Sequence, residues 1–205
     1  VRAQGKEAVL SASTPYGSWY DLFLSAIKRY GLSEILIESS TEIPWGSGLG
    51  GSGATGVALV GGLSHYFNWP WKDDKYRIAF EARALETEEM RQSCGWQDQL
   101  AAAFGGVNLW TARSDSQKPE REKHISLIPK AKALGRHLLL VQTPKQDNSR
   151  SSSEIQRQSR DDISLLEGMV QHALRAYKAV EEMDYTALGE AVGETWEAIK
   201  NFTNG

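Results

Sequence analysis

A glycine-rich stretch, PWGSGLGGSGA, runs from Pro44 to Ala54. It follows a segment that the sequence predicts as a strand and leads into one that it predicts as a helix. Backbone N–H groups at a helix start have no partner within the helix, and glycines let such a backbone close around a phosphate without obstruction by Cβ atoms. The stretch therefore predicts a phosphate-binding loop, with a tight, close-packed turn as the alternative.

Two known phosphate-binding patterns fit this loop poorly. A Walker A loop ends in Gly-Lys-Ser or Gly-Lys-Thr, and no lysine occurs between residues 42 and 63. A dinucleotide-binding loop follows its strand directly, whereas here Pro44 intervenes, and its ribose-binding acid ends an apolar strand, whereas NWPWK precedes Asp73. Its fingerprint G-x-G-x-x-G is matched formally by Gly46, Gly48 and Gly51. Dinucleotide binding therefore stays as a weak alternative.

The carboxylate at position 98 is the second candidate for chemistry. Asp98 lies in the sequence GWQDQ, at the start of a short apolar segment that predicts a helix over residues 97–104. Partial burial at such a helix start could place the carboxylate beside an acceptor hydroxyl, where it would act as a general base. A cap on the helix is the alternative role.

The loop and the GWQDQ segment together resemble the GHMP kinases, the superfamily of galactokinase, homoserine kinase, mevalonate kinase and phosphomevalonate kinase. The family loop has a proline, three variable residues and Gly-Leu-Gly-Ser-Ser before small residues; here Gly51 replaces the first serine and Gly53 follows the second. Residues 95–110, GWQDQLAAAFGGVNLW, resemble the segment that carries the catalytic aspartate, and residues 143–155, TPKQDNSRSSSEI, resemble a later strand-loop-helix. Bacterial heptose-phosphate kinases and their fucokinase relatives are the most similar subgroup.

The resemblance implies ATP and Mg²⁺ as cofactors and gives roles to individual residues. Asp98 corresponds to the catalytic residue, and Ser52 and Glu86 correspond to the residues that bind the metal. Glu88 and Glu89 are close enough in sequence to be alternatives to Glu86, and a solvated acidic helix face would explain all three. The implied nucleotide-binding residues are Gly46, Ser47, Gly48, Leu49, Gly50, Gly51, Ser52, Gly53 and Ala54.

The sequence therefore favours an ATP-dependent kinase that transfers a phosphoryl group to a hydroxyl of a sugar or sugar phosphate, similar to a heptose phosphate. Arg150 and the serines after it could hold an anionic group of that substrate, although a plain helix cap explains the same residues. Because Gly51 departs from the family loop, a non-catalytic nucleotide- or sugar-binding module on the same scaffold is the alternative. A nicotinamide-dependent oxidoreductase ranks far behind.

Composition sets limits on partners and location. The formal net charge of −3, from 23 basic and 26 acidic residues without a basic block, gives no electrostatic reason to bind nucleic acid or an anionic membrane. The one cysteine, Cys94, excludes an internal disulfide and is expected to fill space rather than act as a nucleophile. We expect a cytoplasmic protein. The start at Val1 suggests a cut chain, and the sequence shows neither the N-terminal substrate motif nor the late glycine-rich segment of GHMP kinases, so we expect it to be shortened at both ends.

The elements that position these residues are strands and helices in mixed order, with antiparallel hairpins expected, which favours an α+β fold. We expect a strand pair with its turn near Gly5, and two long helices after residue 152 whose apolar stripes form core. The other expected helices cover residues 16–30, 55–67, 75–90 and 97–104, and the other strands cover 35–39, 107–112, 125–128 and 137–143, with a polar connector over 114–123.

The resemblance also implies a division into domains. Residues 1–112 would form the N-terminal domain of the GHMP kinase fold, which is ribosomal-protein-S5-like, with its first strands missing. Residues 113–205 would form part of a ferredoxin-like C-terminal domain.

Overall fold

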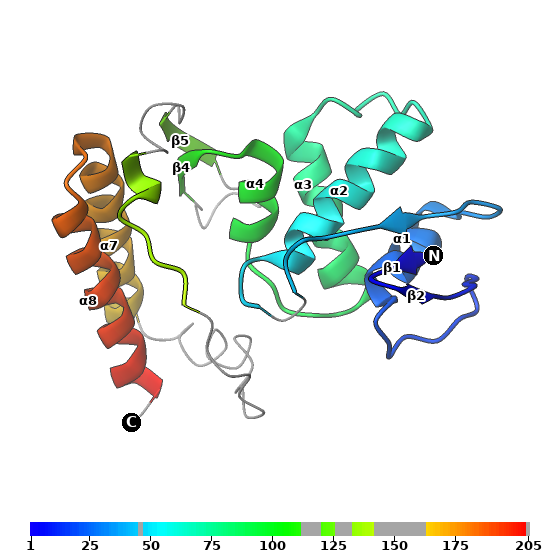
Figure 1. The fold of residues 1–205 in the computed structure, drawn as a ribbon, viewed down its shortest axis with the longest axis horizontal. Helices are drawn as coiled ribbons and strands as arrows, with labels where there is room; N and C mark the ends of the chain where they lie inside the picture. Colours follow the sequence, from blue (N-terminus) through cyan, green and yellow to red (C-terminus); the bar gives the residue numbers. More distant parts are fainter. Residues whose placement is uncertain (45–46, 112–119, 126–132, 142–162, 204–205) are drawn as a thin grey trace. The chain divides into compact units, whose positions relative to one another are not determined.

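The computed structural model describes residues 1–44, 47–111, 120–125, 133–141 and 163–203 (Figure 1). The chain divides into two compact units, residues 1–105 and 106–205. The boundary lies at Gly105 and Gly106, both of which have positive φ angles. Helices and strands follow one another in mixed order, with antiparallel strand pairs, as predicted for an α+β fold.

A small sheet opens the first unit. Strands β1 (Arg2–Ala3) and β2 (Lys6–Glu7) form an antiparallel pair, and β3 (Glu38–Ser39) lies parallel to β1. The strand pair with its turn at Gly5 is confirmed, because Gly5 has a φ of 75°. The strand expected over 35–39 is shorter than predicted.

Helix α1 (Asp21–Tyr30) follows and ends where predicted, at a left-handed Gly31. It begins five residues later than expected. The reason is local, because the Asp21 carboxylate accepts hydrogen bonds from the backbone N–H groups of Gly17 and Ser18 at 2.9–3.0 Å and holds the preceding segment in a turn.

Three consecutive elements carry the predicted site residues. Helix α2 (Gly51–Tyr66) begins four residues earlier than expected, so the end of the glycine stretch is helical. Helix α3 (Lys75–Ala84) continues into a turn of π-helix, η1 (Leu85–Glu89), so the α-helix predicted to run to residue 90 stops earlier. Helix α4 (Gln97–Phe104) has the predicted bounds.

The core of the first unit lies between α1, α2 and α3, and α4 packs on α2 and α3. Helix α2 has apolar and small residues around its whole circumference, as expected for a helix covered on several sides. The side chains that fill this core are Phe23, Ala26, Leu59, Val60, Leu63, Ile78, Ala82 and Leu85.

The second unit contains a two-stranded antiparallel sheet of β4 (Val107–Thr111) and β5 (Glu120–Ile125). The first of these strands was predicted. The strand predicted over 125–128 is misplaced, because the observed strand covers 120–125 and its first four residues belong to the expected polar connector. Residues 126–128 lie outside the described part. Residues 137–141 do not form the predicted strand, and Leu138 to Val141 are exposed.

Helices α7 (Ile163–Glu182) and α8 (Tyr185–Thr203) form the predicted helical hairpin (Figure 1). Tyr177 and Val180 pack with Val107, Leu109 and Leu188, so part of the expected stripe is core. The rest of that expectation is wrong, because other stripe residues are exposed, namely Val170, Leu174, Val192 and Trp196. A ferredoxin-like arrangement of this unit stays a prediction. Among the described helices, none combines the length and the apolar composition needed to cross a bilayer.

Candidate active site

The glycine loop enters α2 through two left-handed residues. Gly48 has a φ of 76° and Gly50, the residue before the helix, has a φ of 70°, a region that side chains disfavour. No side chain in the described part of the chain caps this end of α2. The first N–H groups of the helix are therefore placed to meet an anion, with the positive end of the helix dipole behind them. Gly46 lies outside the described residues.

Asp98 stands directly beside this loop. A Cβ atom built on Gly50 would lie 3.3 Å from Oδ1 of Asp98, and one built on Gly53 would lie 2.7 Å from its Cβ. Gly53 and Asp98, which are 45 positions apart in the sequence, thus meet where α2 and α4 begin. The carboxylate is exposed, so the predicted partial burial of Asp98 is wrong. The first turn of α4 instead presents it to solvent next to the loop.

Glu86 is the buried acid of the site. Its residue is 5% exposed, and its Oε1 accepts a hydrogen bond of 2.9 Å from Nε2 of Gln99. Burial raises the pKa of Glu86, hydrogen bonds from Gln99 and from the Ser52 hydroxyl oppose this rise, and the nearby Asp98 carboxylate adds to it. Ser52, Glu86 and Asp98, which come from three elements, are therefore one electrostatic cluster.

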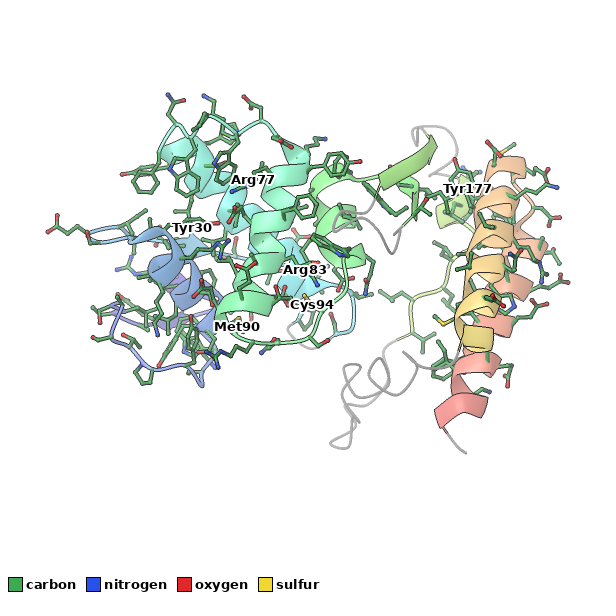
Figure 2. All side chains as sticks on the ribbon, turned by 180° about the vertical axis from the view of Figure 1, so that it is seen from behind. Tyr30, Arg77, Arg83, Met90, Cys94 and Tyr177 are labelled. Carbon is green, nitrogen blue, oxygen red and sulfur yellow. The ribbon has the colours of Figure 1, made fainter. Side chains whose placement is uncertain are left out.

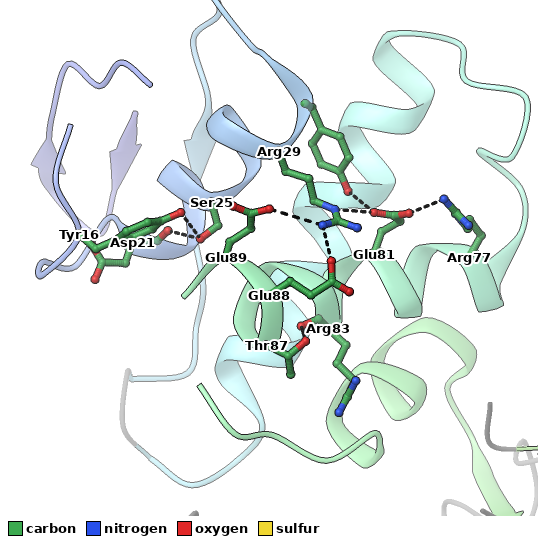
Figure 3. Close-up of polar contacts among 11 residues, drawn as sticks. Tyr16, Asp21, Ser25, Arg29, Arg77, Glu81, Arg83, Thr87, Glu88 and Glu89 are labelled. Atoms are coloured by element: carbon green, nitrogen blue, oxygen red, sulfur yellow. Dashed lines mark hydrogen bonds and ion pairs between the residues drawn. The ribbon is translucent and has the colours of Figure 1, made fainter. Parts of the chain in front are cut away.

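The other two acids of the same turn face elsewhere. Nη1 of Arg29 lies 2.8 Å from a carboxylate oxygen of Glu88 and 3.5 Å from one of Glu89 (Figure 3). A π-helical turn holds an extra residue compared with an α-helical turn, which changes the directions of its side chains. Of the three acids that the sequence left as alternatives, Glu86 is the one that interacts with Ser52 and Gln99, and the other two pair with Arg29.

Arg83 ties the segment that precedes Asp98 to helix α3. Its guanidinium donates hydrogen bonds of 3.2 Å to the backbone carbonyls of Cys94 and Gly95 and lies 4.1 Å from the centre of the Trp96 ring. Figure 2 shows Arg83 and Cys94 as neighbours. Burial raises the pKa of the Cys94 thiol, in keeping with its expected role in packing.

The oxygen atoms of this cluster suit Mg²⁺. Magnesium uses one or two protein oxygens together with water and phosphate oxygens, rather than a cage of protein ligands. The described residues contain no group of three or more His, Cys, Asp or Glu side chains arranged for a metal. A hydroxyl and a carboxylate at Ser52 and Glu86, with a second carboxylate close by, fit a hard cation that shares its coordination with a polyphosphate.

Dinucleotide binding does not fit the geometry. Asp73, the acid that this alternative requires near the loop, lies 3.7 Å from Nε2 of His65 at the far end of α2. Since His65 is 14 residues after Gly51 in that helix, the two ends are roughly 21 Å apart at 1.5 Å per residue. The acid is therefore too far away to act with the glycines.

Comparison with known proteins agrees with this arrangement. The family model "GHMP kinases N terminal domain" matches residues 19–106, a range that includes the glycine loop, Glu86 and Asp98. The chain contains a GHMP kinase N-terminal domain. The resemblance predicted from the two motifs is confirmed.

The curated proteins that are similar to this chain include sugar kinases. It is 28% identical over 170 residues to a D-glycero-alpha-D-manno-heptose 7-phosphate kinase of Campylobacter jejuni, covering 80% of this chain and 48% of the relative. It is 30% identical over 171 residues to an L-fucokinase/L-fucose-1-P guanylyltransferase of Bacteroides fragilis, covering 80% and 18%. A galactokinase of Thermosipho africanus is 26% identical over 234 residues, covering 95% and 63%. The chain thus spans less than two thirds of each relative, and no solved structure matches it significantly.

Gln99 and Arg83 belong to this site but were not predicted as site residues from the sequence. Gln99 is a polar residue followed by the apolar run LAAAF, which was the available signal. Arg83 gave no signal, because its carbonyl partners are 11 and 12 residues away. Arg150, the predicted anion-binding residue, lies outside the described residues.

Proposed function

We propose that the protein is an ATP-dependent kinase that transfers the γ-phosphoryl group to a hydroxyl of a sugar or sugar phosphate. The observation that supports this most directly is the position of Asp98, whose Oδ1 lies 3.3 Å from a Cβ built on Gly50 of the glycine loop. A carboxylate in that position is close to the end of any polyphosphate bound by the loop. Phosphoryl transfer needs this proximity, because it depends mainly on positioning and charge stabilisation.

Each group of the site has a defined role in the proposed reaction. The backbone N–H groups from Gly48 to Gly53 bind the phosphates. Ser47 and Ala54 flank them, and their N–H groups donate to the carbonyls of Pro44 and Gly50. Gly46 would extend the loop. Ser52 and Glu86 would hold Mg²⁺, which would supply neutralisation of charge on the phosphate oxygens. Asp98 orients the acceptor hydroxyl and takes its proton as the oxygen bonds to the γ-phosphorus and the bond to the β-phosphate oxygen breaks.

A heptose phosphate or a related sugar is the proposed acceptor. This class is supported by the Campylobacter and Bacteroides relatives, whose names specify a heptose 7-phosphate kinase and an L-fucokinase. The alternative, a nucleotide- or sugar-binding module without catalysis, is favoured by one observation: Gly51 lacks the hydroxyl of the family loop. The cytoplasmic location and the absence of nucleic-acid and membrane partners stay predictions from the sequence.

The test is turnover by the purified protein with ATP, Mg²⁺ and a panel of aldoses, fucose and heptose phosphates. We expect ADP formation that depends on one class of acceptor and falls by at least about 10²-fold in Asp98→Asn, the scale of a lost proton acceptor. Asp73→Asn is the matched control, because its carboxylate is exposed at the far end of α2. Unchanged turnover in Asp98→Asn would refute the mechanism, and Mg²⁺-dependent ATP binding without turnover would establish the alternative.

A further inference from the structure

Gln99 is a buried amide in contact with the proposed metal site. Its residue is 2% exposed, and its Nε2 lies 2.9 Å from Oε1 of Glu86 and 3.9 Å from the Cys94 sulfur. Its other polar atom, Oε1, is buried and has no hydrogen-bond partner among the residues that the structure describes. Half of this amide is therefore bound and half is left unsatisfied.

An unsatisfied buried oxygen is unfavourable for folding, so packing alone does not explain a glutamine at this position. An apolar side chain of the same length would fill the space without the penalty. The shorter of the two contacts that the amide nitrogen makes is its donation to Glu86, at 2.9 Å against 3.9 Å to the Cys94 sulfur. A carboxylate that receives a donor on one oxygen is fixed in rotation and offers its other oxygen to a cation, and such contacts set the orientation and affinity of metal ligands.

We propose that Gln99 is a positioning residue that fixes the Glu86 carboxylate so that it presents a single oxygen to Mg²⁺. This inference rests on the proposed function, because it requires that Glu86 and Ser52 hold the metal. Asp98 precedes Gln99 on the same helix turn, but the two side chains differ in surroundings: Asp98 is exposed beside the loop and Gln99 is buried against η1. One turn of α4 thus supplies both the proposed catalytic carboxylate and the support for the metal ligand.

The test measures the Mg²⁺ concentration that gives half-maximal binding of a non-hydrolysable ATP analogue. Gln99→Met keeps the length of the side chain and removes the amide. We expect the half-maximal Mg²⁺ concentration to rise by about 10- to 100-fold, the usual effect of removing a contact that orients a metal ligand. Gln99→Asn, which keeps the amide but is too short to reach Glu86, should give the same shift and serves if the methionine variant does not fold.

Cys94→Ala is the matched control, because it removes the sulfur contact of Gln99 and leaves the bond to Glu86. Its Mg²⁺ dependence should match the wild type. A purely structural role for Gln99 would lower the unfolding temperature of Gln99→Met and leave the Mg²⁺ dependence within about twofold of the wild type, and that result would refute the inference alone. A wild-type protein with no Mg²⁺-dependent nucleotide binding would refute the proposed function and the inference together.

Discussion

Gly53 and Asp98 approach each other so closely that a side chain does not fit between them. A Cβ atom on Gly53 would lie 2.7 Å from the Cβ of Asp98, 3.1 Å from its carbonyl carbon and 3.2 Å from the backbone nitrogen of Gln99. Two of these three are backbone atoms of α4, which cannot move without shifting the helix. The small residue after Ser52 therefore sets the distance between the proposed phosphate loop and the proposed catalytic carboxylate.

Replacing Gly53 with alanine should separate the starts of α2 and α4. We expect Gly53→Ala to lower the free energy of unfolding by about 1–3 kcal/mol, the usual cost of overpacking, and to weaken binding of an ATP analogue. Gly51→Ala is the matched control, since a Cβ there meets nothing within 4 Å and the residue has no positive φ. It should change stability by less than about 1 kcal/mol. Equal effects in both variants, by urea denaturation, would contradict the close approach.

Arg83 should hold the segment between η1 and α4 in place. Arg83→Met removes two charge-assisted hydrogen bonds to the carbonyls of Cys94 and Gly95 and the contact with Trp96, a loss of about 2 kcal/mol after rehydration of the carbonyls. Arg91 lies in this segment, so trypsin cleavage after Arg91 reports its opening. We expect faster cleavage in Arg83→Met. Arg83→Lys should give an intermediate rate, because it keeps the charge but loses the planar guanidinium that donates to two carbonyls at once. A wild-type rate in Arg83→Met would contradict this role.

The sequence predicted elements well where local signals mark both ends. Helix α4 has the predicted bounds because a polar first turn, QDQ, follows GW and leads into the apolar run LAAAF, which stops at Gly105. Strand β5 was misplaced because its sequence, EREKHI, lacks an apolar alternation, while the apolar residues 138–141 are exposed and not in a strand. The end of α3 was missed because the apolar pattern continues through η1 while the hydrogen bonding changes.

The site residues likewise divide into those that the sequence marks and those that depend on contacts between distant segments. The loop and Asp98 were found from local pattern, and Ser52 and Glu86 from the family resemblance. Which of the three neighbouring acids belongs to the site depends on Arg29, 59 residues before Glu88, and on the π-helical turn. A local sequence pattern therefore does not predict the choice among them. The exposure of Asp98 likewise depends on how α2 and α4 pack.

Arg29 should stabilise the first unit through a buried carboxylate. Glu81 is buried and receives Arg29 Nε at 2.8 Å, Arg77 Nη2 at 2.6 Å and the Tyr30 hydroxyl at 3.2 Å (Figure 3). Arg29→Met leaves this charge with two of its three donors, so we expect a loss of about 3 kcal/mol, the low end of the cost of breaking a buried pair.

Glu88, the exposed partner of Arg29 in the same network, supplies the control. Glu88→Gln removes only the surface contact with Arg29 and should cost less than about 1 kcal/mol. Both values come from urea denaturation of the two variants and the wild type. If Arg29→Met were no less stable than Glu88→Gln, the buried bond to Glu81 would contribute nothing.

Glu86 should reduce stability at neutral pH while it serves the proposed metal site. Burial raises its folded-state pKa above the ordinary value of 4.5, so the folded protein holds the proton more tightly than the unfolded chain. That contribution to stability is complete below pH 4.5 and is lost as the pH rises through the folded-state pKa. Glu86→Gln is neutral at every pH and lacks this dependence, so in EDTA the wild type is less stable relative to the variant at pH 7.5 than at pH 4. We expect the variant to be as stable as the wild type or more stable at pH 7.5, and to lose this relative advantage at pH 4.

The same substitution should act in the opposite direction on nucleotide binding. Glu86→Gln removes a charged oxygen ligand, so Mg²⁺-dependent binding of the ATP analogue should weaken by at least about tenfold, whereas Glu88→Gln should bind as the wild type does. Denaturation at the two pH values and Mg²⁺ titration separate the two effects, since a residue that only supports the fold would lose stability and binding together. A variant that is destabilised at pH 7.5 and keeps the wild-type Mg²⁺ dependence would show that Glu86 is a structural acid and not a metal ligand.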